Sequence, residues 1–366
     1  MKNFKIFLMS AAAVCSLGFA SCVNDLDVEP IDPNVTMPED VLNTEEAYTR
    51  LLAKCYSGLA ASGGFGKDGG CDLSGIDGGF SQYFRGRYHL NGLTTDESVC
   101  GWNDQTLQNL HGLSWTTDDV FVAAFYYRIF YQLSALNNFI RYVNRAEIEL
   151  PEKDLWIAEA RTLRALCWLD AIDNYGNVPF ADENTPVGMY TPEQISRDSL
   201  FNYIEADLKD VLAGDALYDY GQGGYGRANK GLAAMILAKL YLNAEVYTGK
   251  AMYAEAAALC KQIMTDHPLH TTAVNPDNSP YAELFMADNH QFYGKELIFV
   301  IPQDSQNLTS WGVTNYLIYA GCSASSDSPD EYYMNPLEQG ISSGWGGLSL
   351  TYEFSDKFDS TIVKHL

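Results

Sequence analysis

Residues 228–268 read ANKGLAAMILAKLYLNAEVYTGKAMYAEAAALCKQIMTDHP and indicate two consecutive helices, at 228–247 and 251–266. Each segment places apolar residues on one helical face, and a helix of this kind cannot bury that face alone. Small residues allow two such helices to approach closely, while the bulky residues beside them fill the gap. The stretch therefore predicts a pair of packed helices.

The same stretch resembles a tetratricopeptide repeat. Leu237-Ala238 followed by Tyr241 is similar to the first helix of such a repeat, and four later residues have the spacing of its second helix. Those four are Ala256, Cys260, Ile263 and Pro268. A generic helical hairpin is the alternative, because the connection is about six residues longer than in the standard repeat.

Further helices are expected before residue 228. The helical spacing of apolar residues predicts them at 44–59, 118–146, 151–175 and 192–213. Asp118 is the expected N-cap of the second of these helices. Cys167 and Cys260 fall on apolar stripes and are expected to be buried thiols, and Trp156 and Trp168 are expected in the core. The predicted fold class is mostly α.

The other segments are expected to be irregular. A loop insertion at 62–117 begins with a glycine-rich stretch and continues with short strand or turn pieces. Residues 269–366 predict loops and turns with one strand at 296–301 (ELIFVI). We therefore expect a helical scaffold at 44–268, with an irregular part after it, and loops of this kind often carry function.

The N-terminus predicts export. Two lysines precede an apolar run that ends in small residues before Cys22, which is the pattern of a secretory signal at 1–21. Residues 19–22 (FASC) resemble a bacterial lipobox, whose cysteine becomes the acylated N-terminus. An ordinary signal followed by an unmodified cysteine is the alternative. Residues 22–43, punctuated by prolines, predict an extended tether.

Charge argues against one class of partner. The chain has 23 Lys+Arg and 47 Asp+Glu, which gives a formal net charge of −24. Proteins that bind nucleic acid contact phosphates mainly through Lys and Arg, so no nucleic-acid partner is expected. Hydrophobic residues make up 47% of the chain, enough for a sizeable core.

Motifs for catalysis or cofactor binding are weak. Residues 64–69 and 221–226 match the dinucleotide string G-x-G-x-x-G, but neither lies between a buried strand and a helix. Residues 340–344 match the string of a hydrolase nucleophile elbow but lead into glycines instead of a helix. No cysteine pair has the CxxC spacing of a zinc or redox site. No cofactor, metal site or catalytic residue is predicted.

Aromatic residues in loops are the best candidates for a binding site. A sugar offers flat C–H faces that stack on aromatic rings, and hydroxyls that take polar partners, so such a site needs no nucleophile. Trp102-Asn103-Asp104 joins a ring to two polar side chains. The other candidates are Trp311, Tyr316, Tyr319, Trp345 and Arg85, with Arg87 beside it. Packing of the loops onto the scaffold is the alternative for each ring, and surface ion pairing is the alternative for the arginines.

Short motifs along the chain together resemble the SusD/RagB family of outer-membrane nutrient-binding lipoproteins. They are Leu26-Asp27-x-x-Pro30 after Cys22, Leu93-Thr94-Thr95-Asp96-Glu97, Glu159-Ala160-Arg161-x-Leu163-Arg164-Ala165, Tyr175-Gly176-x-x-Pro179, Gly226-Arg227-Ala228-x-Lys230, Tyr281-x-x-Leu284-Phe285 and Glu296-x-Ile298-Phe299. The resemblance spans most of the chain. Family members usually continue well past a segment like 352–359, so the irregular part at 269–366 is expected to be incomplete.

The resemblance implies a binding protein without enzymatic activity. It implies tetratricopeptide-like helical pairs with an irregular ligand-binding part, a lipid anchor at Cys22 and a place on the outer face of the outer membrane. The implied partner is a SusC-like TonB-dependent transporter, which receives captured oligosaccharide. A peptide ligand, as in the RagB branch, is an alternative. A surface glycoside hydrolase and a structural repeat protein are the other two possibilities that the sequence leaves open.

Overall fold

The computed structural model describes residues 41–64, 70–188, 191–303, 313–327 and 333–358. The chain forms two compact units, and the boundary between them lies between Ala47 and Tyr48. Of the first unit, only residues 41–47 are described, and they contain the start of one helix. All contacts reported below lie within the second unit.

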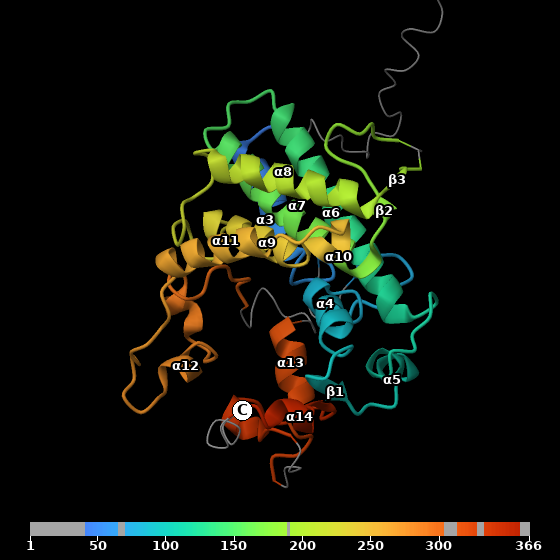
Figure 1. Cartoon of the computed structure of the whole chain (residues 1–366), viewed down its shortest axis with the longest axis vertical. Helices are drawn as coiled ribbons and strands as arrows, with labels where there is room; N and C mark the ends of the chain where they lie inside the picture. The colour runs from blue at the N-terminus through green and yellow to red at the C-terminus, as the bar shows by residue number, and fades with distance from the viewer. Residues whose placement is uncertain (1–40, 65–69, 189–190, 304–312, 328–332, 359–366) are drawn as a thin grey trace, which may run out of the picture. The chain divides into compact units, whose positions relative to one another are not determined.

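Helices make up most of the regular structure (Figure 1). They are α3 (Glu45–Ser57), α4 (Tyr83–Asn91), α5 (Gln105–His111), α6 (Val120–Asn144), α7 (Lys153–Tyr175), α8 (Arg197–Ala213), α9 (Lys230–Leu242), α10 (Ala244–Thr248), α11 (Tyr253–Asp266), α12 (Pro280–Glu283), α13 (Val313–Gly321) and α14 (Tyr352–Ser355). Strand β1 (Ser98–Cys100) pairs antiparallel with β4 (Leu348–Leu350), and β2 (Val178–Pro179) pairs antiparallel with β3 (Gln194–Ile195). The predicted fold class, mostly α, is confirmed.

The long helices pack in the order of the chain. Helix α6 packs on α7, α7 on α8, α8 on α9 and α9 on α11, as the neighbouring coils in Figure 1 show. Their shared core contains Trp156 and Trp168, which are 2% and 1% exposed, as predicted. Consecutive helices therefore bury the apolar faces that none of them buries alone.

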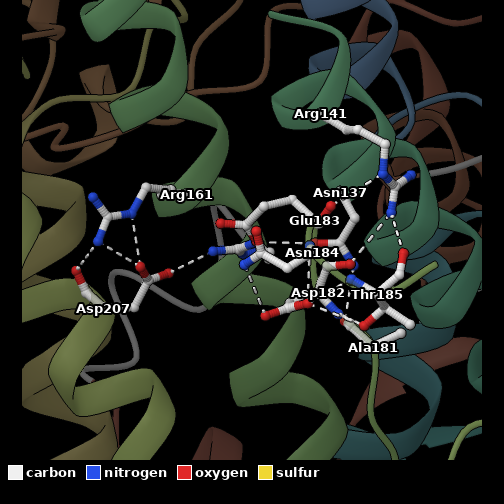
Figure 2. A network of polar contacts seen from close by, with 10 residues as sticks. Asn137, Arg141, Arg161, Ala181, Asp182, Glu183, Asn184, Thr185 and Asp207 are labelled. Carbon is white, nitrogen blue, oxygen red and sulfur yellow. Dashed lines mark hydrogen bonds and ion pairs between the residues drawn. The ribbon is translucent and has the colours of Figure 1, made fainter. Parts of the chain in front are cut away.

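Arginines of α7 join this helix to its neighbours. The guanidinium of Arg161 lies 2.7 Å from Oδ1 of Asp207 on α8 (Figure 2), and Arg164 lies 3.2 Å from Oδ2 of the same residue. Arg164 is 2% exposed in its side chain and also pairs with Glu183. A buried charge is tolerated when it is paired and hydrogen-bonded in this way.

Two residue-level predictions are wrong. The N-cap of α6 is Asp119 rather than Asp118, because the Asp119 carboxylate accepts hydrogen bonds from the main-chain N–H groups of Phe121 and Val122. Cys167 is fully buried as predicted, but Cys260 is exposed. Helix α11 packs mainly on α9, and the buried residues of α11 are Ala256 and Ile263.

Three segment-level predictions also differ from the structure. The strand expected at 296–301 is absent there, where only an isolated bridge joins Tyr293 to Leu297. Asn229 is the N-cap of α9, and its side chain donates to the carbonyl of Ile298 (3.2 Å). This carbonyl is therefore bonded to a helix cap and not to a neighbouring strand. The segments 62–117 and 269–366 were expected to be irregular, but the first contains α4 and α5 and the second contains α12, α13 and α14.

Candidate functional site

Three of the predicted aromatic residues come together beside helix α13. Trp102 follows strand β1, Trp345 precedes strand β4, and the pairing of these two strands brings the residues together. The main-chain N–H of Trp345 donates to the carbonyl of Tyr319 on α13 (2.6 Å). Strand pairing and this backbone contact therefore place the three side chains at one site.

We call Trp102, Trp345 and Tyr319 the aromatic platform. The ring centroids of Trp102 and Trp345 lie 6.3 Å apart with an angle of 51° between the rings. Those of Tyr319 and Trp345 lie 5.1 Å apart at 32°. Trp345 is 37% exposed, and the other two side chains are half-buried. The platform thus combines fixed ring geometry with access for a ligand, which stacking on a sugar requires.

Tyr316 is buried behind the platform. Its ring centroid lies 6.2 Å from that of Trp102, and its hydroxyl lies 3.0 Å from Nε2 of His89 on α4. Tyr316 is fully buried, and burial raises the pKa of its hydroxyl. The residue supports the platform from the protein side and presents no ring face to solvent.

Arg85 adds a guanidinium to the same region. Its Cζ lies 4.4 Å from the centroid of Tyr316, and its Nη1 donates to the carbonyl of Gly79 (2.8 Å). Arg85 is 8% exposed, and burial lowers its pKa. Among the described residues, no carboxylate forms an ion pair with it and its Nε has no hydrogen-bond partner. Arg87, by contrast, pairs with Asp170 (2.9 Å), so the ion-pairing alternative holds for Arg87 alone.

A pocket of about 310 Å³ opens between α4 and α13. It is lined by Phe84, Arg85, Arg87, Tyr88, Asn91, Gly92, Glu97, Tyr316 and Leu317. Its volume lies at the lower end of the range for small-molecule sites. The lining combines aromatic rings with two guanidinium groups, an amide and a carboxylate, which are the groups that bind sugar hydroxyls and C–H faces.

The remaining predicted site residues fall into two groups. Asn103 and Asp104 are exposed and directly follow Trp102 in the chain. Trp311 and Cys22 lie outside the described residues. Tyr88 and His89 line or support the site but were missed by sequence reasoning, because the segment that forms α4 gave no helical signal.

Within the part of the chain that the structure describes, the molecule has no cluster of three or more His, Cys, Asp or Glu side chains able to hold a metal ion. The same part contains no helix with the length and apolar character needed to cross a membrane.

The chain is similar in sequence to a known starch-binding protein. The starch-binding protein SusD of Bacteroides thetaiotaomicron is 32% identical over 319 residues, which cover 86% of this chain and 54% of the relative. The chain thus spans about half the length of that protein. No family model matches the chain.

Solved structures share the fold. Surface glycan-binding protein A from Bacteroides fluxus superposes with a TM-score of 0.62 at 20% identity, covering 88% of this chain and 63% of that one. Surface glycan-binding protein A from B. thetaiotaomicron, solved in complex with laminarihexaose, superposes with a TM-score of 0.59 at 16% identity, covering 86% and 61%. By name, these relatives and the starch-binding protein are binding proteins rather than enzymes.

Proposed function

This chain belongs to the SusD/RagB family, and on that premise we propose that it binds a glycan at the aromatic platform without cleaving it. The observation that carries the proposal is the meeting of Trp102, Trp345 and Tyr319, from three separate segments, next to a pocket that contains Arg85. The starch- and glycan-binding names of the relatives support the same class of ligand.

Each part of the site has its own task in this proposal. The indole rings of Trp102 and Trp345 stack on the C–H faces of sugar rings. The side chains of Asn103 and Asp104 take hydroxyls at the edge of the platform, and Arg85 donates to hydroxyl or ring oxygens inside the pocket. Binding of this kind needs no activated nucleophile and no metal ion.

The proposal extends to the place of the protein in the cell. We propose that Cys22 is acylated and anchors the protein to the outer face of the outer membrane, since several acyl chains give nearly permanent attachment. The partner is then a SusC-like TonB-dependent transporter, to which the protein delivers the bound oligosaccharide. Replacement of Cys22 by Ser should release the protein from the membrane fraction, and continued association would contradict the anchor.

Native gels that contain single polysaccharides, starch and laminarin among them, test the binding site. Trp102→Ala and Trp345→Ala should lose retardation in the gel that retards the wild type, with an increase in Kd of at least about tenfold. Trp115→Ala is the matched control, because Trp115 is 44% exposed but lies outside the platform. Retardation of all variants like the wild type would contradict the proposal.

The same experiment separates the alternatives. Incubation of the protein with the retained polysaccharide should release no new reducing ends, and release of them would make the protein a surface glycoside hydrolase. Retention of peptides in place of every polysaccharide would favour the RagB-like peptide alternative. Copurification with a large β-barrel transporter after mild solubilisation tests the delivery step.

A further inference from the structure

Two glycines follow Trp345 and form what we call the glycine turn, Gly346–Gly347. Their φ angles are +63° and +116°, a region that L residues rarely adopt. The N–H of Gly346 donates to the carbonyl of Cys322 (2.8 Å), and the N–H of Gly101 donates to the carbonyl of Gly347 (2.7 Å). The turn is thereby fixed between the end of α13 and the end of β1.

The glycine turn lies directly against the indole of Trp102. A Cβ placed on Gly347 would lie 2.1 Å from Nε1, 2.4 Å from Cδ1 and 2.8 Å from Cε2 of that ring. The Nε1–H group donates to the carbonyl of Gly346. One glycine therefore supplies the hydrogen-bond acceptor, and the other supplies the space in which the ring lies.

We propose that Gly347 is a positioning residue of the ligand site, which fixes the indole of Trp102 and thereby the angle between the two tryptophans of the platform. The proposal rests on the proposed function, because it concerns the same rings. No sequence motif marks this glycine, and its role follows from the space it leaves for the ring.

The consequence of a side chain at Gly347 follows from contact distances. Non-bonded heavy atoms pack at about 3.5–4.0 Å, so a methyl group would push the indole aside by roughly 1 Å or more. That movement breaks the hydrogen bond to Gly346 and changes the position of Trp102 relative to Trp345, which lies at a centroid distance of 6.3 Å. A ligand that stacks on both rings would then lose one of them.

Three alanine substitutions separate this effect from backbone strain. Gly340→Ala also places a Cβ at positive φ (+75°), but nothing lies within 4 Å of that Cβ. Gly188→Ala does so at +151°, beyond the +116° of Gly347, and again nothing lies within 4 Å of the Cβ. Only Gly347→Ala combines positive φ with a clash against Trp102. The first two variants are therefore matched controls.

Fluorine NMR of protein labelled with 5-fluorotryptophan tests the positioning without any ligand. The Trp102 resonance, assigned with Trp102→Phe, should shift in Gly347→Ala and stay in place in Gly340→Ala. An unchanged Trp102 resonance in Gly347→Ala would overturn the proposal. If Gly347→Ala alone does not fold, adding Trp102→Ala should restore folding, because the ring that clashes has been removed. A double variant that stays unfolded would also overturn it.

Glycan affinity tests the consequence for binding. Gly347→Ala should raise Kd by about tenfold or more, and Gly340→Ala should change it less than about twofold. In a Trp102→Ala background, Gly347→Ala should cause no further loss, because it acts through that ring. A further tenfold loss would overturn the proposal. If Trp102→Ala itself leaves affinity intact, the proposed binding role of the platform fails, while the fluorine shift still decides the positioning.

Discussion

At Glu159, two of the motifs that resemble the family meet. Its carboxylate is fully buried and accepts hydrogen bonds from Nη2 of Arg227 (2.6 Å) and from the hydroxyl of Tyr56 (2.9 Å). Burial raises the pKa of Glu159. The sequence contained both charged residues, but their pairing joins positions 68 residues apart and became visible only in the structure. Glu159 and Arg227 therefore join α7 to the segment that leads into α9, and neither residue lines the pocket.

The hydrogen bonds of the single residue Glu283 predict that the stability of the fold depends on pH. Its carboxylate accepts hydrogen bonds from the main-chain N–H groups of Asn275 (2.7 Å) and Val274 (2.9 Å) and from the ring of His270 (2.7 Å). These hydrogen bonds, that of Asn275 foremost, lower the pKa of Glu283 from 4.5 to about 2. A lowered pKa stabilises the fold above the ordinary pKa, and this contribution is lost as the pH falls through about 2.

Urea unfolding of Glu283→Gln at a series of pH values measures that contribution. The difference in unfolding midpoint between wild type and variant should be largest above pH 4.5 and should shrink toward pH 2. Glu338→Gln changes an exposed glutamate and should show no such trend. A constant difference for Glu283→Gln across this range would contradict the explanation.

At the scale of single elements, long helices followed from the sequence and short ones did not. Helices α6 and α7 repeat apolar residues over many turns, so their existence was predictable even though the cap of α6 was placed one residue early. Helices α4 and α13 have nine residues each, and helices this short depend on tertiary packing for their stability. Both short helices line the candidate site.

This difference explains what could be predicted about the site. The sequence singled out Trp102 and Trp345 as rings in loops, and the structure places both on the aromatic platform. Their meeting depends on the pairing of β1 with β4, which joins segments more than 200 residues apart and has no local signal. Tyr316 was expected in a loop but lies buried on α13, because the helix there was not predicted.

The N-cap of α6 gives a prediction for this helix. Asp119 is buried, accepts hydrogen bonds from two main-chain N–H groups of the first turn, and also accepts one from the hydroxyl of Thr106 on α5. Asp119→Ala should lower the free energy of unfolding by about 0.5–2 kcal/mol, because those groups lose their acceptor. Asp118 is the exposed neighbour, and Asp118→Ala should change the free energy of unfolding by no more than about 0.5 kcal/mol. Equal effects of the two substitutions in urea unfolding would contradict the assignment of the cap.

At the scale of the whole chain, helix α6 links the loop insertion to the scaffold. Arg128 is fully buried in α6; its Nη2 donates to the carbonyl of Ser62 (2.8 Å) and its Nη1 pairs with Asp72 (3.3 Å). Its Nε donates to the carbonyl of Ser81, one residue before the N-cap of α4. One side chain thus contacts Ser62 and Ser81, the two ends of what we call the glycine-rich loop. The second contact also holds the start of the helix that carries Arg85.

Helix α6 contains a second buried arginine, Arg141, which contacts a different loop. Arg141 is 9% exposed, and its guanidinium donates to the carbonyls of Glu183 (3.0 Å) and Thr185 (2.9 Å) in the loop that follows β2 (Figure 2). That loop contributes no residue to the aromatic platform or to the pocket beside it. Arg128 and Arg141 therefore provide a pair of buried arginines on one helix, only one of which lies behind the candidate site.

Replacing each arginine by Met separates stability from binding. Arg128→Met removes the Arg128 donor from the carbonyls of Ser62 and Ser81 and from Asp72, which keeps its ion pair with Lys54 (3.0 Å). It should lower the free energy of unfolding by about 1–3 kcal/mol. It should also weaken glycan binding, because the start of α4 loosens and Arg85 loses its fixed position. Arg141→Met should lower stability by about 1–3 kcal/mol and leave the glycan Kd within about twofold.

Hydrogen exchange identifies where each substitution acts. In Arg128→Met, amide exchange should rise at 70–91, where the loop leads into α4, and in Arg141→Met it should rise at 181–188. Glycan Kd is measured at a temperature at which both variants remain folded, so that a change in affinity does not simply reflect unfolding. Equal losses of affinity in the two variants would show that binding follows overall stability, and the link from α6 through the glycine-rich loop to Arg85 would then be wrong.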